Sequence, residues 1–151
     1  MIYYRNGVRR SGVDGRALVA TAKRLLAAID QRDSALSLTL IGDPAMRELN
    51  REYREKDAPT DVLSFPMEQA PLADAQRLLG DVVISVDTAA RQASEYDATL
   101  QRELYRLLIH GLLHLLGHDH VRAAERRVME REERRLAAAI ALPWPYDPVE
   151  G

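Results

Sequence analysis

The stretch HGLLHLLGHDH, residues 110–120, decides the fold and holds all four histidines of the chain. It continues an apolar pattern that begins after Thr99, in which leucines recur at helical spacing from Leu104 to Leu115. Gly117 follows the last of these leucines, and glycine often ends a helix because it adopts the left-handed conformation without a steric penalty. The sequence therefore predicts a helix that is capped by Thr99, apolar on one side, and stopped by Gly117.

The spacing of three histidines predicts a metal site at the end of this helix. His110 and His114 are four residues apart, so both rings project from one helix face, about 6 Å apart along the axis. A bend at Gly117 would let His120 return to the same ion. Three imidazole ligands suit one zinc ion and leave a fourth position for water, which is typical of a catalytic zinc site. Nickel, copper and iron also bind imidazole, so the metal in the cell stays open.

The ordinary alternative is that these histidines are hydrogen-bonded core residues. That alternative would have to account for three histidines at spacings of four and six, with a glycine at the bend and no histidine elsewhere. His118 flanks the turn, and we expect it not to be a ligand. Asp119 is either a turn residue or a carboxylate that orients a ligand imidazole.

The His-x3-His-x2-Gly-x2-His spacing is that of the metzincin peptidases. Those enzymes carry a glutamate that acts as general base after the first histidine, where this chain has Gly111. Without that glutamate, hydrolysis of a peptide by water lacks its proton acceptor. The pattern therefore favours a metal-dependent hydrolase and disfavours a peptidase.

The rest of the chain predicts the order β-α-β-α-β-β-α-α-α. The expected strands are 1–5, 36–41, 62–65 and 81–86. The first expected helix begins after an Asp14 cap, and the second runs from an Asp43 cap, with a proline at the first helical position, to about Arg54. The third runs from an Asp87 cap to near Tyr96, the fourth from a Thr99 cap to Gly117, and the last spans Arg122–Ile140. Residues 66–79 form a longer connection, and 143–148 form a non-helical tail. The predicted fold class is α+β: a small mixed sheet of about four strands packed with about five helices, one of them a zincin-like metal-binding helix. The strand order does not follow from the sequence.

Composition restricts the class of protein further. A length of 151 residues fits one domain, 1–151, and 46% hydrophobic with 29% charged residues is typical of a soluble globular protein. The absence of cysteine excludes disulfides and thiolate metal sites. We expect a cytoplasmic protein without a secretory signal or membrane helix. A net charge of −2 means that any RNA contact depends on a local patch rather than on overall positive charge.

Two blocks resemble the YbeY family of bacterial rRNA maturation factors. Residues 110–120 are similar to that family's H-G-x-L-H-L-x-G-x-D-H signature, and residues 49–66, LNREYREKDAPTDVLSFP, are similar to a second block. Residues 79–84, LGDVVI, match a third, weaker piece. The blocks come in the family's order. The visible departure is His118, where the family usually has an aromatic residue.

The resemblance implies one zinc ion on His110, His114 and His120, and catalytic roles for Arg54 and His110. It also implies an endoribonuclease that acts in rRNA processing, especially 3′-end maturation of the small-subunit (16S) RNA, and in ribosome quality control. The implied partners are ribosomal RNA, the ribosome and its assembly factors. The nucleophile is either the RNA 2′-hydroxyl or water activated by the metal. A hydrolase of a peptide or amide, and a non-catalytic zinc-containing assembly factor, are the alternatives.

The residues of the second block leave the role of Arg54 open on their own. Three basic residues, Arg47, Arg51 and Arg54, share one face of the predicted helix, and a glutamate follows each of them. This pattern fits a local positive patch and a salt-bridged solvated face equally well. Asp61 and Asp81 are further candidate polar groups near the cleft.

Overall fold

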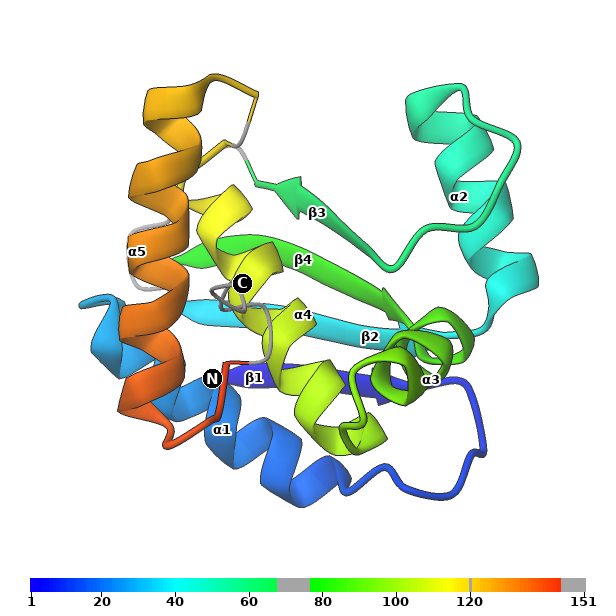
Figure 1. The fold of residues 1–151 in the computed structure, drawn as a ribbon, viewed down its shortest axis with the longest axis horizontal. Coiled ribbons are helices and arrows are strands. Elements are labelled where there is room, and N and C mark those ends of the chain that lie inside the picture. Colours follow the sequence, from blue (N-terminus) through cyan, green and yellow to red (C-terminus); the bar gives the residue numbers. More distant parts are fainter. Residues whose placement is uncertain (68–76, 120, 145–151) are drawn as a thin grey trace.

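Four strands form one mixed sheet in the computed structural model, which describes residues 1–67, 77–119 and 121–144. The strands are β1 (Ile2–Asn6), β2 (Ala35–Ile41), β3 (Val62–Pro66) and β4 (Leu78–Ser85). The helices are α1 (Gly15–Ala28), α2 (Asp43–Arg54), α3 (Val86–Glu95), α4 (Leu100–Leu115) and α5 (Ala123–Ala139) (Figure 1). Their order along the chain is the predicted one, and the α+β class is confirmed.

The order of the strands in the sheet is β1-β2-β4-β3. β1 pairs with β2, and β2 with β4, in parallel, whereas β3 pairs with β4 in an antiparallel ladder. Parallel neighbours need a crossover connection, and α1 supplies it between β1 and β2. The antiparallel β3 lies at one edge of the sheet, next to β4.

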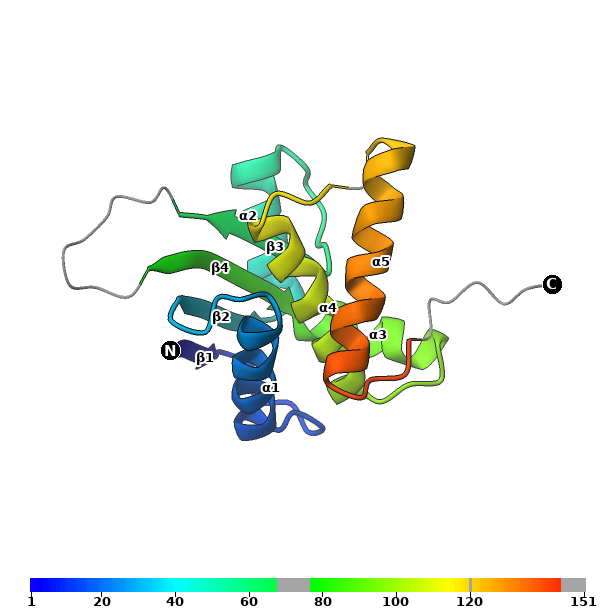
Figure 2. The same cartoon turned by 90° about the vertical axis from the view of Figure 1, so that its left-hand side faces the viewer.

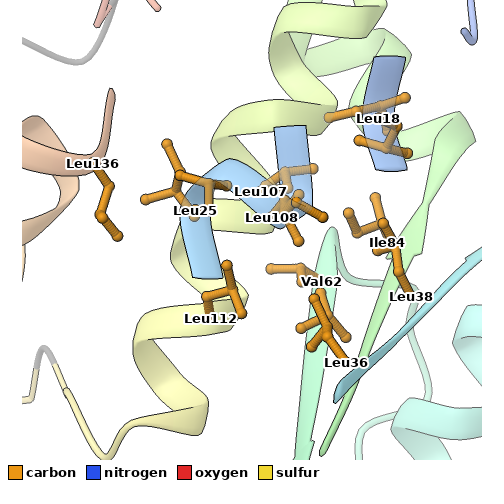
Figure 3. Packing of buried hydrophobic residues seen from close by; sticks show 14 of the residues in the cluster. Leu18, Leu25, Leu36, Leu38, Val62, Ile84, Leu107, Leu108, Leu112 and Leu136 are labelled. Carbon is orange, nitrogen blue, oxygen red and sulfur yellow. The ribbon is translucent and has the colours of Figure 1, made fainter. Parts of the chain in front are cut away.

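Helix α4 lies between the sheet and α5, as Figure 2 shows from the side. Val82 and Ile84 of β4 point to this face and join the main core, whereas Val83 points to the opposite face and packs with Met46 of α2. Figure 3 shows the main core, in which leucines of α1 and α4 meet the strands and Leu136 of α5 joins them. The helix with the histidine pair is therefore held by core packing on several sides.

Gly111 allows α4 to approach the sheet closely. A Cβ atom at this position would lie 2.7 Å from Val82 Cγ1 and 3.2 Å from Ser64 Oγ. The Ser64 hydroxyl also donates a hydrogen bond of 2.8 Å to the Gly111 carbonyl. The position where metzincin peptidases carry their glutamate thus faces the sheet here, with no room for a side chain.

The predicted caps Asp14 and Thr99 are confirmed, because their side chains accept from backbone N–H groups of their own helices, at 3.0 Å and 3.2 Å. The prediction that β4 begins at Asp81 was wrong, since the strand begins at Leu78 and ends at Ser85. Gly80 opposes Pro66 of β3 in the ladder, so strand pairing overrides the low strand propensity of glycine. Of the expected connection 66–79 and tail 143–148, residues 68–76 and 145–148 lie outside the described residues.

The sequence predicted that Asp43 and Asp87 cap their own helices, and this prediction was wrong. Gly42 caps α2, and Ser85 caps α3. The two aspartates instead link the two helix starts: Asp87 Oδ2 accepts from the Asp43 N–H at 2.8 Å, and Asp43 Oδ1 accepts from the Ser85 hydroxyl at 2.6 Å. The N-termini of α2 and α3 lie side by side, so each carboxylate bonds across to the other element.

The hydrogen bonds around Asp43 also set its acidity. Partial burial raises the pKa of this carboxyl, but hydrogen bonds from Ser85, Thr88 and Arg91 together outweigh that effect, so its pKa lies below the ordinary value. Arg91 forms an ion pair of 2.8 Å with it. The junction of α2 and α3 is therefore built around a carboxylate that stays charged.

Across the described part of the chain, no helix has the length and apolar character needed to span a membrane.

Candidate functional site

His110 and His114 converge on one face of α4. Their Nε2 atoms are 3.1 Å apart, and their ring centroids are 4.6 Å apart with the ring planes at 73°. This arrangement follows from the helix itself, because residues one turn apart project from the same face. The predicted convergence of the two rings is present in the structure.

The separation of the two Nε2 atoms suits a metal ion. Two ligand nitrogens at roughly 2.0–2.1 Å from a tetrahedral zinc ion are about 3.3 Å apart, close to the observed separation. Gly117 adopts a positive φ of 93° just after α4, so the chain turns where the sequence predicted a bend. His120 lies outside the described residues, and within the described ranges no three His, Cys, Asp or Glu side chains group as metal ligands. The spacing of the two histidines thus fits a metal ion, and all three metal ligands stay a prediction.

The other nitrogen of His110 faces α5. Its Nδ1 atom lies 3.5 Å from Glu133 Oε2, and the Glu133 side chain is 15% exposed. Glu133 was not among the site residues predicted from the sequence. The signal was present: the buried residues Met129, Leu136 and Ala137 place position 133 on the packed side of the helix.

A cleft of about 670 Å³ lies beside the two imidazoles. Its polar lining includes Arg54 from the end of α2, Asp61 from the residue before β3, and Asp119 after α4. A neighbouring cavity of about 460 Å³ shares Asp61 and His110 with the cleft. Three separate parts of the chain therefore meet at the histidine pair.

Asp61 is held firmly at the edge of this cleft. Its Oδ1 accepts from the Val62 N–H at 2.8 Å, and its Oδ2 accepts from Gln92 Nε2 of α3 at 3.3 Å. The second aspartate that the sequence offered as a candidate, Asp81, is not among the described residues that line either cavity. His118, expected not to be a ligand, is likewise absent from the described lining of both.

The three arginines of α2 have different surroundings. Arg47 donates two hydrogen bonds to Asp57, of 2.7 Å and 2.9 Å, and Arg51 forms an ion pair of 2.6 Å with Glu48. The hydrogen bonds to Asp57 raise the pKa of Arg47 and lower that of Asp57. Arg54 is exposed and lines the cleft, and its side chain has no hydrogen bond or ion pair with any residue in 1–67, 77–119 or 121–144. The salt-bridged interpretation thus holds for two arginines, and Arg54 is available to a ligand.

Comparison with known proteins gives several matches over most of the chain. A family profile described as "Endoribonuclease YbeY" matches residues 6–141. A protein of that name from Anaeromyxobacter sp. strain Fw109-5 is 52% identical over 84% of this chain and 65% of its own length. Another from Moorella thermoacetica is 46% identical, over 85% of this chain and 90% of its own length. The chain thus spans less than two thirds of the Anaeromyxobacter relative and nearly all of the Moorella one.

The fold also matches a solved structure. The solution structure of TM1509 from Thermotoga maritima superposes with a TM-score of 0.59 at 23% identity, covering 100% of this chain and 99% of the other. This likeness supports the α+β architecture. From the profile match and the relatives at 46–52% identity, the chain belongs to the endoribonuclease YbeY family.

Proposed function

We propose that this chain is a metal-dependent endoribonuclease that cleaves phosphodiester bonds in ribosomal RNA. Residues 1–151 act as one domain in the cytoplasm, in 3′-end maturation of the small-subunit RNA and in quality control of ribosomes, together with the ribosome and its assembly factors. The observation that carries the proposal is the convergence of His110 and His114, with Nε2 atoms 3.1 Å apart, in a cleft that Arg54 also lines. Membership of a family described as endoribonucleases supports the choice of RNA.

His110 and His114 would hold the ion through Nε2, with His120 as the third ligand. Imidazole ligands favour zinc, one ion per chain. When bound, such an ion supplies Lewis acidity toward a phosphoryl oxygen. The two imidazoles that would hold the ion are themselves held in place, because their helix packs directly on the sheet.

Arg54 binds the phosphate in this proposal. A guanidinium presents planar donors that match phosphate oxygens, and it stays charged at any physiological pH. Its place at the end of α2, in the same cleft as the imidazoles, lets it stabilise the charge that grows on the equatorial oxygens during cleavage. RNA carries its own 2′-hydroxyl, which is one possible nucleophile, so the absence of a glutamate at position 111 is less damaging here than in a peptidase.

The charges of the cleft support metal dependence independently of the histidine geometry. Arg54 supplies one positive charge, and Asp61 and Asp119 supply two negative charges. With neutral imidazoles these three charges sum to −1, so a cation held beside them would favour binding of a phosphate. Chelation should therefore weaken RNA binding as well as stop cleavage.

The test is cleavage of an RNA fragment that spans the 3′ end of the small-subunit RNA. His110→Ala and His114→Ala should lose bound metal and cleavage together, whereas His118→Ala is the matched control and should keep both. Elemental analysis of each purified protein gives the metal content. Full cleavage by metal-free His114→Ala would overturn the proposal.

The ends of the RNA products identify the nucleophile. A 2′,3′-cyclic phosphate indicates attack by the 2′-hydroxyl, and a 3′-hydroxyl with a 5′-phosphate indicates attack by water. If removal of the metal by a chelator unfolds the protein, as measured by circular dichroism, the metal is structural, which would favour a non-catalytic assembly factor. A peptidase is disfavoured because Gly111 offers no carboxylate to act as general base.

A further inference from the structure

We propose that Glu133 is a positioning residue for the metal ligand His110. Its carboxylate faces the N–H group at His110 Nδ1 and keeps the proton on that nitrogen, which would leave the Nε2 lone pair directed at the ion. The inference rests on the metal-binding part of the proposed function and extends it to a residue of α5 outside both family motifs.

The two nitrogens of His110 face different partners. Nδ1 lies 3.5 Å from Glu133 Oε2, and Nε2 lies 3.1 Å from His114 Nε2. A neutral imidazole carries one proton, on one nitrogen or the other, and only the bare nitrogen can bind a metal. A carboxylate beside Nδ1 favours the proton there, because an ionised carboxylate can only accept hydrogen bonds. The arrangement therefore favours the tautomer that metal binding through Nε2 requires.

Packing of α5 fixes the place of this carboxylate. Position 133 shares a helix face with the buried residues Met129, Leu136 and Ala137, and the Glu133 side chain is 15% exposed. A partly buried carboxylate interacts with its neighbour through less water than an exposed one, so its influence on the proton of His110 is stronger.

The neighbouring Glu132 offers a matched control. Its side chain is 32% exposed and forms an ion pair of 2.7 Å with Arg135 on the same helix. Glu132→Ala removes the same charge from the same turn of α5 but removes no contact with His110. Comparison of the two alanine variants separates the contact from a general effect of charge.

The first measurement is metal affinity, by competition between the protein and a chromophoric zinc chelator. Glu133→Ala should bind zinc about 10–100-fold more weakly than the wild type, the usual effect of removing a partner that orients a ligand. Glu133→Gln keeps an acceptor oxygen and should recover most of the affinity, and Glu132→Ala should match the wild type. Wild-type affinity in Glu133→Ala, or an equal loss in Glu132→Ala, would overturn the proposal.

The second measurement is the tautomer of His110 in the metal-free protein, by nitrogen-15 NMR of the imidazoles. The wild type should carry the proton on Nδ1, and Glu133→Ala should shift it toward Nε2. If Glu133→Ala does not fold, the tautomer of His110 in the wild type decides. A wild-type His110 protonated on Nε2 refutes the role of Glu133.

These outcomes are distinguishable from failure of the proposed function, since neither measurement involves RNA. A protein that binds zinc as predicted but cleaves no RNA contradicts the endoribonuclease proposal and leaves the role of Glu133 supported. A wild type that binds no zinc contradicts both.

Discussion

Replacement of Gly111 by alanine tests whether the close contact of α4 with the sheet positions the histidine pair. Alanine is a better helix former than glycine by about 1 kcal/mol, so an open helix surface would gain stability from this change. Here the new methyl group would lie 2.7 Å from Cγ1 of Val82, which is fully buried and β-branched and cannot rotate away. Overpacking of this kind costs up to about 3 kcal/mol, so the net loss should be about 2 kcal/mol.

Urea unfolding of the metal-free protein measures this loss, which should also lower the Tm by about 4–8 °C. In a Val82→Ala background the contacts with both valine methyl groups disappear and only the 3.2 Å contact with Ser64 Oγ remains, so Gly111→Ala should no longer destabilise the protein relative to that background. Gly117→Ala is a contrasting control, because its φ of 93° is strained for alanine although, among the described residues, none beyond its chain neighbours lies within 4 Å of the new Cβ. Its loss should be the same in both backgrounds. If Gly111→Ala stabilises the otherwise wild-type protein, or destabilises both backgrounds equally, the packing argument is wrong.

Three further predictions concern charged groups. Arg54→Ala should lower the cleavage rate about 10²–10³-fold with zinc affinity unchanged, and a parallel fall in metal content would contradict its proposed contact with phosphate. The folded-state pKa of Asp43 lies below the ordinary 3.8, so its contribution to stability is complete above that pH and is lost as the pH falls through the depressed pKa. Urea unfolding of Asp43→Asn should therefore show a deficit at pH 7 that shrinks in acid; a deficit independent of pH would argue against this linkage. Arg106→Ala should destabilise the folded protein by about 3–5 kcal/mol, because it removes the guanidinium that forms an ion pair with the buried carboxylate of Glu103. An apolar double variant, Arg106→Met with Glu103→Leu, should recover most of that loss, as measured by thermal unfolding.

The helices and strands were largely predictable because their signals are local. Apolar periodicity, turn residues and two of the caps identified every element in its correct order, and Gly117 marked the end of α4. The errors occurred where a residue bonds across to another element: Asp43 and Asp87 link α2 to α3 instead of capping their own helices. A capping pattern along the chain does not say whether a neighbouring helix start offers a better partner.

The sequence by itself determined the histidine pair, because the pitch of a single helix places His110 and His114 on one face. Only the tertiary structure decided what surrounds that pair. The strand order brings Asp61 to the cleft, the contact of α4 with β4 makes Gly111 a packing position, and the packing of α5 carries Glu133 to His110. The physical reason is that helix pitch is a property of consecutive residues, whereas contacts between elements depend on how their apolar faces fit together in space, which periodicity along one chain does not encode.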